Sequence, residues 1–459
     1  MKLRLGIVVW VLWVGVAAAS STLEAYLADV GLSNKASIVL LDVRTGKVIE
    51  SVDGRKSLPP ASVTKAITVP YALEALGAGF RFETRVIATG PVEGGIVQGD
   101  LVLQGGGDPL LDTDGLFNMA SGLRDQGIRG VTGRFLFADG AISNVDQVDN
   151  DQPEWVGYNP ALSGLNLNFN RVYFEWKGGE LSLTAKSDNH APPVSGVKIA
   201  ITEKADPVFD HDTRGDEEVW TVARPALGNG GSRWLPVRAP GAYAADVFRT
   251  LAADVGVALP EPVRATDTLE GRVLVSESGA TLMSLGRGML KFSTNLSAEI
   301  VGMRASDALG KTPANHNQSA KRMTDWARHQ YGVTGISFRD HSGLSDVSKA
   351  NALSLARIMQ FEVKRGLYPA LLKVIPTDAP DSVSVRAKTG SLNFVSTLAG
   401  VIQGPKGDFA FAILMADEDR RAAGKRAGHE RPAGARTWMK SARDAQKAIL
   451  MYWAEKYVQ

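Results

Sequence analysis

The sequence predicts an α/β domain that is divided along the chain and hosts a β-rich insertion. Helical and strand patterns are mixed before about residue 82 and again after about residue 268. Between these positions, short alternating runs are separated by Gly, Asn and Pro, as in all-β regions. We therefore expect the α/β domain at 20–81 and 268–459, and the β-rich insertion at 82–267.

The sequence pattern predicts each element in turn. The stretch "ASIVLLDVRTGKVIESV" indicates two strands around a turn at Thr45-Gly46, and "AITVPYALEALGAG" indicates a helix that ends at Gly77 or Gly79. In the insertion, only 241–257 has a long helical period. The remaining elements are helices at 281–310, 319–332 and 435–458 and strands at 382–394, 396–404 and 408–416.

Three further stretches have structural explanations. The final helix has an apolar face that predicts packing across a sheet, with a membrane-surface role as the alternative; the face comprises Trp438, Ala442, Ala445, Ile449 and Trp453. The charged run "DEDRRAAGKRAGHERPAGAR" before it predicts a solvated loop. "GGGDP" predicts a turn in which Asp108 bonds the backbone, and "LNLNFN" predicts a strand with structural asparagines.

Residues 1–19 have the layout of a secretory signal. Two cations, an apolar run and three small residues follow one another, with cleavage expected after Ala19. The apolar run is shorter than the roughly 20 residues of a membrane-spanning helix, which disfavours an N-terminal anchor. We therefore expect an exported, periplasmic protein, soluble or loosely membrane-associated, without stable insertion in the membrane.

Composition excludes several kinds of site. The chain has no Cys, so disulfides, thiolate chemistry and Cys-ligated zinc are excluded. Its six His form no HExxH or other helical pair, so we expect no metal and no cofactor. Removal of 1–19 takes away Lys2 and Arg4 and no acidic residue, which reduces the formal charge of +2 to 0. A neutral chain argues against nucleic acid as the partner.

The candidate chemistry begins in "PPASVTKAIT", where Ser62 and Lys65 stand three residues apart. On a helix these side chains share a face, and a neutral lysine can take the proton of a serine nucleophile. The pKa of the lysine must then fall from ~10.4 toward ~7–8, which corresponds to about 3–4 kcal/mol. A helix terminus supplies at most about 2 kcal/mol, so burial or a second cation must supply the rest, and the hypothesis requires another lysine close to Lys65. Helix capping is the alternative explanation of Ser62.

Lys388-Thr389-Gly390, the only KTG in the chain, supplies that cation from a predicted strand. Ser293-Thr294-Asn295 interrupts the helical region between the other two motifs. SxxK, SxN and KTG in this order form the signature of penicillin-binding proteins and serine β-lactamases. Other copies do not fit: Ser195–Lys198 lies on a strand pattern, Ser187-Asp188-Asn189 lies in the β-rich region, and Ser391-Leu392-Asn393 is the end of the KTG stretch.

Longer segments extend the similarity. The sequence resembles the D-alanyl-D-alanine carboxypeptidase/endopeptidase family of class C low-molecular-weight penicillin-binding proteins (peptidase family S13). The segments are "PASVTK", "LVLQGGGDP", "ALSGLNLNFNRV", "KFSTNLSAEIVG", "DHSGLSDVSKANAL" and "RAKTGSLNFVSTLAG". The resemblance implies a serine transpeptidase/β-lactamase-like α/β (α+β) fold, with a sheet that has helices on one side, a mostly helical lobe, and an insertion of two nested subdomains.

The resemblance also implies an activity and partners. Similar proteins release terminal D-alanine from peptidoglycan stem peptides or cut their D,D-crosslinks through an acyl-enzyme, and penicillin acylates them. Ser62 would be the nucleophile and Lys65 its base, Ser293 and Lys388 would relay a proton, and Asn295 would hold the substrate amide. Thr389 would bind the terminal carboxylate with Lys388, Gly390 would let the substrate backbone approach, and the N–H groups of Ser62 and Ser391 would form the oxyanion hole. Leu344 would border the substrate.

Departures from the family leave alternatives open. His341 stands where glycine is common and Asp346 where a basic or polar residue is frequent, which leaves the stem-peptide preference open. Asp340 beside His341 permits a Ser-His-Asp arrangement as an alternative. A serine β-lactamase and a catalytically idle cell-wall-binding protein of the same fold are the other functions. The long interval between Lys65 and Ser293 argues against a class A β-lactamase, and the five intact motif residues argue against an idle protein.

Overall fold

The computed structural model describes residues 22–214, 217–266, 270–310, 312–427 and 430–459. The predicted secretory signal at 1–19 lies outside the described residues. The chain forms two compact units. The first contains the residues up to Tyr71, Gly286–Ser293 and Ala320–Gln459, and the second contains Ala72–Leu285 and Thr294–Ser319. The domain boundaries expected near 82 and 268 stay a prediction.

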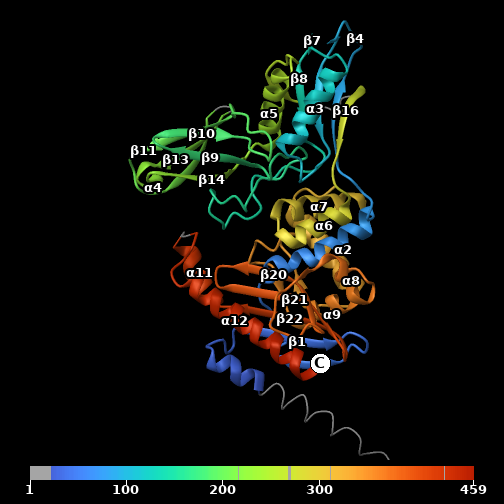
Figure 1. Cartoon of the computed structure of the whole chain (residues 1–459), viewed down its shortest axis with the longest axis vertical. Coiled ribbons are helices and arrows are strands. Elements are labelled where there is room, and N and C mark those ends of the chain that lie inside the picture. Colours follow the sequence, from blue (N-terminus) through green and yellow to red (C-terminus); the bar gives the residue numbers. More distant parts are fainter. Residues whose placement is uncertain (1–21, 215–216, 267–269, 311, 428–429) are drawn as a thin grey trace, which may run out of the picture. The chain divides into compact units, whose positions relative to one another are not determined.

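The first unit is built on a six-stranded antiparallel sheet (Figure 1). All five longer strands were predicted from their alternating or continuous apolar runs. In spatial order the strands are β19 (Lys373–Val374), β20 (Ser384–Leu392), β21 (Val395–Gly404), β22 (Gly407–Ala416), β1 (Ala36–Asp42) and β2 (Val48–Val52). A two-stranded ribbon of β17 (Ile336–Ser337) and β18 (Lys349–Ala350) lies apart from it.

Helices cover both faces of this sheet, so the expectation of helices on one side only is wrong. Helix α12 (Ala435–Trp453) lies across strands β20–β22 (Figure 1), and its five predicted apolar residues are buried in one core with Ile38 and Phe411. The prediction that this helix packs across a sheet is therefore confirmed. Successive strand residues point to opposite faces, so Val39 lies on the other face, where α9 (Ala352–Lys364) contacts β1 and β22. No helix of the described part of the chain is long and apolar enough to span a membrane.

The SxxK segment lies at the junction of two elements of the first unit. The short turn η1 (Ala61–Thr64) continues directly into α2 (Lys65–Leu76), and η1 contacts β20 and β21. Three helices, α2, α6 and α8, begin in one unit and end in the other. The bounds of the remaining helical elements are α6 (Leu282–Phe292), α8 (His316–Tyr331), α10 (Tyr368–Leu371), α11 (Glu418–Arg426) and the terminal turn η2 (Ala454–Val458).

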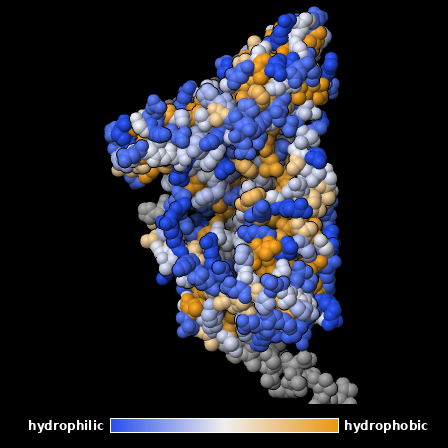
Figure 2. Space-filling view, viewed as in Figure 1, coloured by the Kyte–Doolittle hydropathy of each residue, from blue (hydrophilic) through white to orange (hydrophobic). Residues whose placement is uncertain are grey.

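The predicted solvated loop before α12 is wrong in its first half, which forms α11. Hydrophilic residues predominate over this helix (Figure 2), as its composition indicates. Asp417 caps its N-terminus by accepting the Arg420 N–H at 3.2 Å, and acidic residues at its start and basic residues at its end complement the helix dipole. Arg421 is buried within it. Caps and charge order, not apolar periodicity, therefore form this helix.

The second unit is rich in strands, as predicted. Its central sheet has the order β15-β8-β6-β3-β16, and α3 (Thr113–Asp125) and α5 (Pro240–Asp254) share one core with it. The sheet comprises β3 (Glu83–Ala88), β6 (Leu101–Gly105), β8 (Phe135–Ala138), β15 (Pro262–Arg264) and β16 (Arg272–Ser278). Three smaller sheets have three strands each. The first contains β10 (Glu180–Thr184), β9 (Arg171–Lys177) and β14 (Gly230–Pro236), and the second contains β11 (Val197–Thr202), β13 (Glu217–Ala223) and β12 (Phe209–Arg214). The third contains β4 (Val92–Glu93), β5 (Ile96–Val97) and β7 (Gly130–Val131). The short α4 (Arg224–Leu227) and α7 (Asn295–Ala308) complete the unit.

Helix α3 was not predicted because two glycines weaken its helical propensity. A Gly costs about 1 kcal/mol relative to Ala inside a helix. At Gly122, however, an added Cβ would lie only 3.3 Å from Val275, so the glycine lets α3 pack closely on β16. Packing outweighs propensity here.

The predicted strand in "LNLNFN" is wrong, although its asparagines are structural. Asn168, Phe169 and Asn170 have positive φ angles of 50°, 58° and 55°, which no strand allows. The Asn170 side chain donates to Ala161 O at 2.9 Å and to Asn166 Oδ1 at 2.7 Å. The predicted turn at "GGGDP" is confirmed, since Asp108 Oδ1 accepts the Leu110 N–H at 2.8 Å.

We predict that two Trp→Phe substitutions on the same face of α12 have unequal costs. Trp453 Nε1 donates to Oε2 of the buried Glu50 at 2.9 Å, whereas Trp438 Nε1 is buried with no acceptor among the described residues. Trp453→Phe should lower the free energy of unfolding by about 1–3 kcal/mol because it leaves a buried carboxylate with one donor fewer. Trp438→Phe is the matched control and should cost less. Denaturant unfolding measures both, and equal losses would contradict the assigned hydrogen bond.

Candidate active site

Ser62 and Lys65 are brought together at the junction of η1 and α2. Lys65 Nζ lies 3.0 Å from Ser62 Oγ and donates to Ser342 O at 2.7 Å. Lys65 is fully buried, while Ser62 is half-buried. Pro60 precedes the turn, and buried Ala61 has a left-handed φ of 46°. The amine is therefore held against the serine hydroxyl by the helix on one side and by a backbone carbonyl on the other.

A second amine–hydroxyl pair is formed by Lys388 and Ser293. Lys388 Nζ on β20 lies 3.0 Å from Ser293 Oγ and donates to Thr389 O at 2.6 Å. Ser293 follows α6 with a left-handed φ of 61°, and its N–H donates to Met289 O at 2.8 Å. Residues in this conformation are strained unless the surroundings fix them, and such strain is concentrated at functional sites.

Gly390 lets the strand with Lys388 approach the turn with Ser62. A Cβ at Gly390 would lie 2.1 Å from Thr397 Oγ1 and 2.9 Å from both Pro60 O and Ser62 N. Thr397 Oγ1 donates to Pro60 O at 2.8 Å and ties the neighbouring strand to the same turn. The contacts at its Cβ position are with the protein's own backbone and Thr397, and the expected room for the substrate backbone stays a prediction.

Burial and repulsion between lysines set the electrostatics of the site. Burial, followed by the charges of Lys65 and Lys373, holds the pKa of Lys388 well below its usual value. The second cation that the sequence argument required near Lys65 is therefore present. Repulsion between two ammonium groups acts on both, so the pair favours at least one neutral amine.

The segment 340–345 packs on the SxxK turn and contains partners that sequence reasoning missed. Gly343 has a φ of 74°, and a Cβ there would lie 1.8 Å from Ala61 O. The Asp340 carboxylate accepts the N–H groups of Gly343 and Ser345, each at 2.6 Å. This loop presents the Ser342 carbonyl to Lys65. Any residue type has a backbone carbonyl, so the sequence could not identify the Ser342 carbonyl as a partner of Lys65. Only the family resemblance of the segment that begins with "DHSGLS" indicated this part of the chain.

Leu344 and His341 of this segment are buried. Leu344 is only 4 % exposed, so its proposed contact with substrate is limited to a small part of its side chain. The His341 ring stacks on Tyr71 at 6.3 Å between centroids, and its Nδ1 lies 3.3 Å from Met323 Sδ. These contacts give no support to the Ser-His-Asp alternative.

Asp346 is bound by two cations of α11. Its carboxylate lies 2.7 Å from Arg421 Nε and 2.9 Å from Lys425 Nζ. Burial raises the pKa of Asp346, but the two cations outweigh burial and hold this pKa below its usual value. Arg421 also donates to Asn393 O at 3.0 Å, which links α11 to the end of the KTG strand.

The remaining predicted residues lie on β20 and α7. Thr389 is half-buried and Ser391 is exposed, with Arg443 of α12 donating to Ser391 Oγ at 3.2 Å. Asn295 begins α7 in the second unit, where its Nδ2 donates to Tyr158 O at 2.7 Å.

The discarded SxxK copy does not form an amine–hydroxyl pair. Ser195 Oγ contacts Asp246, and Lys198 Nζ lies 3.8 Å from Glu217 Oε1.

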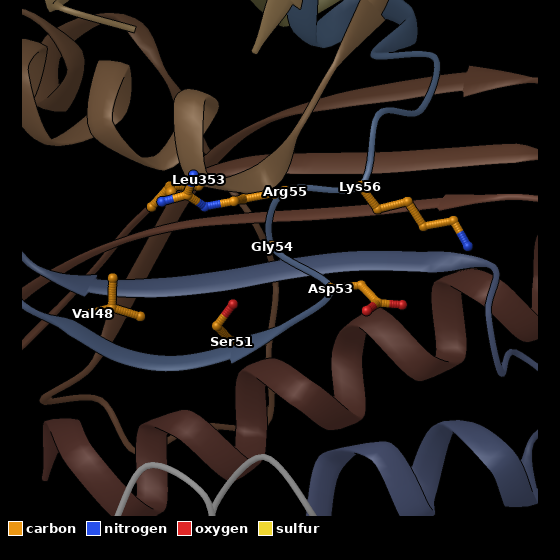
Figure 3. Close-up of a pocket in the computed structure, with 7 residues that line it drawn as sticks. All are labelled: Val48, Ser51, Asp53, Gly54, Arg55, Lys56 and Leu353. Carbon is orange, nitrogen blue, oxygen red and sulfur yellow. The ribbon is translucent and has the colours of Figure 1, made fainter. Parts of the chain in front are cut away.

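A separate hollow of about 660 Å³ lies at the turn after β2 and contains none of the predicted site residues. In Figure 3 the Arg55 side chain extends toward Leu353, and the Lys56 side chain extends in another direction. The N–H groups at the start of α9 already have acceptors: Ala352 N donates to Ser37 Oγ, Leu353 N to Gly54 O and Ser354 N to Asn351 Oδ1. These three N–H groups are therefore already used within the protein.

We predict that Lys388→Met changes the pH dependence of stability. An unfolded lysine keeps its proton to about pH 10, whereas Lys388 releases its proton at lower pH when folded. The unfolded state then binds more protons, so wild-type stability should rise with pH between these two pKa values. Lys388→Met should raise the free energy of unfolding at neutral pH, and the gain should shrink toward pH 10. Half-exposed Lys198→Met is the control; parallel pH profiles for wild type and Lys388→Met would contradict the lowered pKa.

Comparison with known proteins places this chain in a family. The model of the D-Ala-D-Ala carboxypeptidase 3 (S13) family matches residues 19–433. The D-alanyl-D-alanine carboxypeptidase of Actinomadura sp. (strain R39) is 28% identical over an alignment of 472 residues. The match covers 90% of this chain and 86% of that protein.

Solved structures confirm the predicted fold class. The crystal structure of penicillin binding protein 4 (dacB) from Haemophilus influenzae has a TM-score of 0.74 and 19% identity, covering 92% of this chain and 99% of that one. The same protein complexed with a β-lactam gives a TM-score of 0.72 at 19% identity, covering 94% and 99%. With the family match over most of its length, the chain belongs to the D-Ala-D-Ala carboxypeptidase 3 (S13) family of serine-type, penicillin-binding carboxypeptidases.

Proposed function

We propose that this chain is a periplasmic serine D,D-carboxypeptidase and D,D-endopeptidase. Its substrates are the D-Ala-D-Ala termini and the D,D-crosslinks of peptidoglycan stem peptides, and β-lactams are covalent inhibitors. One observation carries the proposal: two amine–hydroxyl pairs, Lys65–Ser62 and Lys388–Ser293, each with an N–O distance of 3.0 Å, are held in one unit. The family assignment and the expected signal at 1–19 support the location in the cell envelope.

Ser62 attacks the carbonyl carbon of the D-Ala-D-Ala bond. Lys65 Nζ accepts the hydroxyl proton as the new C–O bond forms, and the Ser342 carbonyl keeps the amine aligned with Ser62 Oγ. The backbone N–H groups of Ser62 and Ser391 stabilise the oxyanion, and one such donor is worth roughly 3 kcal/mol. The close contact of Gly390 with Ser62 N supports this role, because it fixes the strand that carries Ser391.

Departure of the amine requires a proton, which Ser293 and Lys388 relay. In the free protein Lys388 has a lowered pKa. The terminal carboxylate of the substrate, bound by the Thr389 hydroxyl and Lys388, adds a negative charge that favours the ammonium form. Lys388 therefore gains a proton when substrate binds and passes it through Ser293 to the leaving amine. Water then hydrolyses the acyl-enzyme, so no cofactor takes part.

Asn295 and Leu344 contribute to holding the stem peptide. Asn295 stands two residues after Ser293, and its amide holds the substrate amide. Asp346 is compensated by Arg421 and Lys425, so this position does not offer an uncompensated acid to a basic stem-peptide side chain.

We predict that fluorescent penicillin labels the wild-type protein covalently and that Ser62→Ala abolishes the label. Without Ser62 Oγ no acyl bond can form. Ser195→Ala is the matched control, because Ser195–Lys198 has the same spacing without the amine–hydroxyl contact. Undiminished label on Ser62→Ala would refute the assignment. Rapid loss of the label, with fast turnover of a chromogenic cephalosporin, would instead identify a β-lactamase.

We also predict the products from purified peptidoglycan. Mass spectrometry of digested muropeptides should show pentapeptides that lose one D-alanine and D,D-crosslinked dimers that separate. Both changes should stop after preincubation with penicillin, since one acyl-enzyme serves both reactions. Intact muropeptides under conditions where Ser62 is still acylated would mean that the chain binds cell wall without cleaving it.

A further inference from the structure

The Asn295 side chain is held by a long irregular segment of the second unit. Its Nδ2 donates to Tyr158 O at 2.7 Å. Tyr158 lies between β8 and β9, in a stretch of 139–170 that contains no named helix or strand. Irregular connections of this length are uncommon in compact domains unless they have a function. The position of the Tyr158 carbonyl therefore helps to set the orientation of the Asn295 amide.

Arg238 binds this segment at three backbone carbonyls. Its Nη1 donates to Asp146 O at 2.8 Å and to Asn159 O at 3.1 Å, and its Nη2 donates to Glu154 O at 2.5 Å. Asn159 is the neighbour of Tyr158. A planar guanidinium has donors for several acceptors at once, which a lysine amine cannot reproduce with the same geometry. The guanidinium of Arg238 thus forms hydrogen bonds with the start, the middle and the end of the segment 146–159.

The backbone of Arg238 is itself fixed. It stands between β14 and α5, and the N–H groups of Arg238 and Ala239 donate to the Glu218 carboxylate at distances of 2.6–2.9 Å. Glu218 is 4 % exposed and lies on β13. The guanidinium is therefore carried by a buried, hydrogen-bonded part of the β-rich unit.

The segment 146–159 also has hydrogen bonds between its own residues. Asn159 Oδ1 accepts the Asp149 N–H at 2.9 Å, and Asn159 Nδ2 donates to Asp149 O at 2.8 Å. His316 Nε2 at the start of α8 lies 2.9 Å from Val148 O. Because these hydrogen bonds connect the residues of the segment, a displacement of the segment at Arg238 also displaces the Tyr158 carbonyl.

We propose that Arg238 is a positioning residue of the S13 reaction: by holding the carbonyls of Asp146, Glu154 and Asn159, it fixes the Tyr158 carbonyl that orients Asn295. The inference rests on the proposed role of Asn295 in binding the substrate amide. Arg238 touches neither substrate nor reacting atoms and acts only through Asn295.

A double-mutant cycle on the full chain tests this coupling. The variants are Arg238→Gln, Asn295→Ala and the double variant, with the second-order rate of acylation by penicillin and kcat and KM for a D-Ala-D-Ala peptide as readouts. Misplacement of a substrate-binding group by about 1 Å can cost 10²-fold, so Arg238→Gln should lower acylation about ten- to a hundredfold. In the Asn295→Ala background it should cause no further loss.

The matched control is Arg249→Gln in α5 of the same unit. Arg249 is also mostly buried, with an ion pair to Glu261 at 2.8 Å. Its effect should be small and equal in both backgrounds. If Arg238→Gln fails to fold, as judged by thermal unfolding, Arg238→Lys replaces it and should give an intermediate loss with the same coupling.

The outcomes separate the inference from the proposed function. Equal fold-losses for the Arg238 variant with and without Asn295, or no loss in a folded Arg238→Gln, would overturn the inference alone. Unchanged acylation in Asn295→Ala would remove the proposed role of Asn295 and the inference with it, while covalent label on Ser62 would still establish the nucleophile.

Discussion

The burial of two lysine amines beside two serine hydroxyls is the constraint on which the rest of the structure depends. Lys65 and Lys388 are both 1 % exposed or less. An ammonium group in such a place costs several kcal/mol, and a second ammonium nearby adds repulsion. This cost has a chemical consequence, because it favours the neutral form of one of the two amines. The fold must supply the stability that this arrangement consumes, and the apolar core between the sheet and α12 does so.

Steric fit, more than the motif side chains, determines how closely the segments that contain Gly390 and Gly343 approach the turn with Ser62. Two glycines are critical: Gly390 on β20 and Gly343 in the loop after β17. A Cβ at Gly390 would collide with Thr397 and the Pro60–Ser62 backbone, and a Cβ at Gly343 would collide with Ala61 O. The SxxK turn is thus clamped between segments that are distant in the sequence. Neither segment could move away without releasing a lysine from its hydroxyl.

Local patterns explain which parts of this arrangement could be predicted from the sequence. The strands of the main sheet and α12 follow from apolar periodicity, and Ser62 and Lys65 follow from i, i+3 geometry. Helix α3 was missed because its glycines serve packing against Val275, and α11 because its caps and charges replace an apolar face. The Ser342 carbonyl and the three carbonyls at Arg238 could not be predicted, since backbone acceptors have no residue signature and their partners are remote in the chain.

The lowered pKa of Lys388 links recognition to proton supply in the proposed mechanism. A group cannot bind a carboxylate by its charge and remain a neutral base at the same time, so one role must follow the other. In the free protein, burial and Lys65 disfavour the charge on Lys388. A bound carboxylate reverses this balance, and the proton gained is the one that the leaving amine later needs. Ligands without a terminal carboxylate would bind without loading the acid. Selectivity for a carboxy-terminal D-amino acid would then arise in the chemical step as well as in binding, because the same Lys388 amine, 3.0 Å from Ser293 Oγ, would serve both.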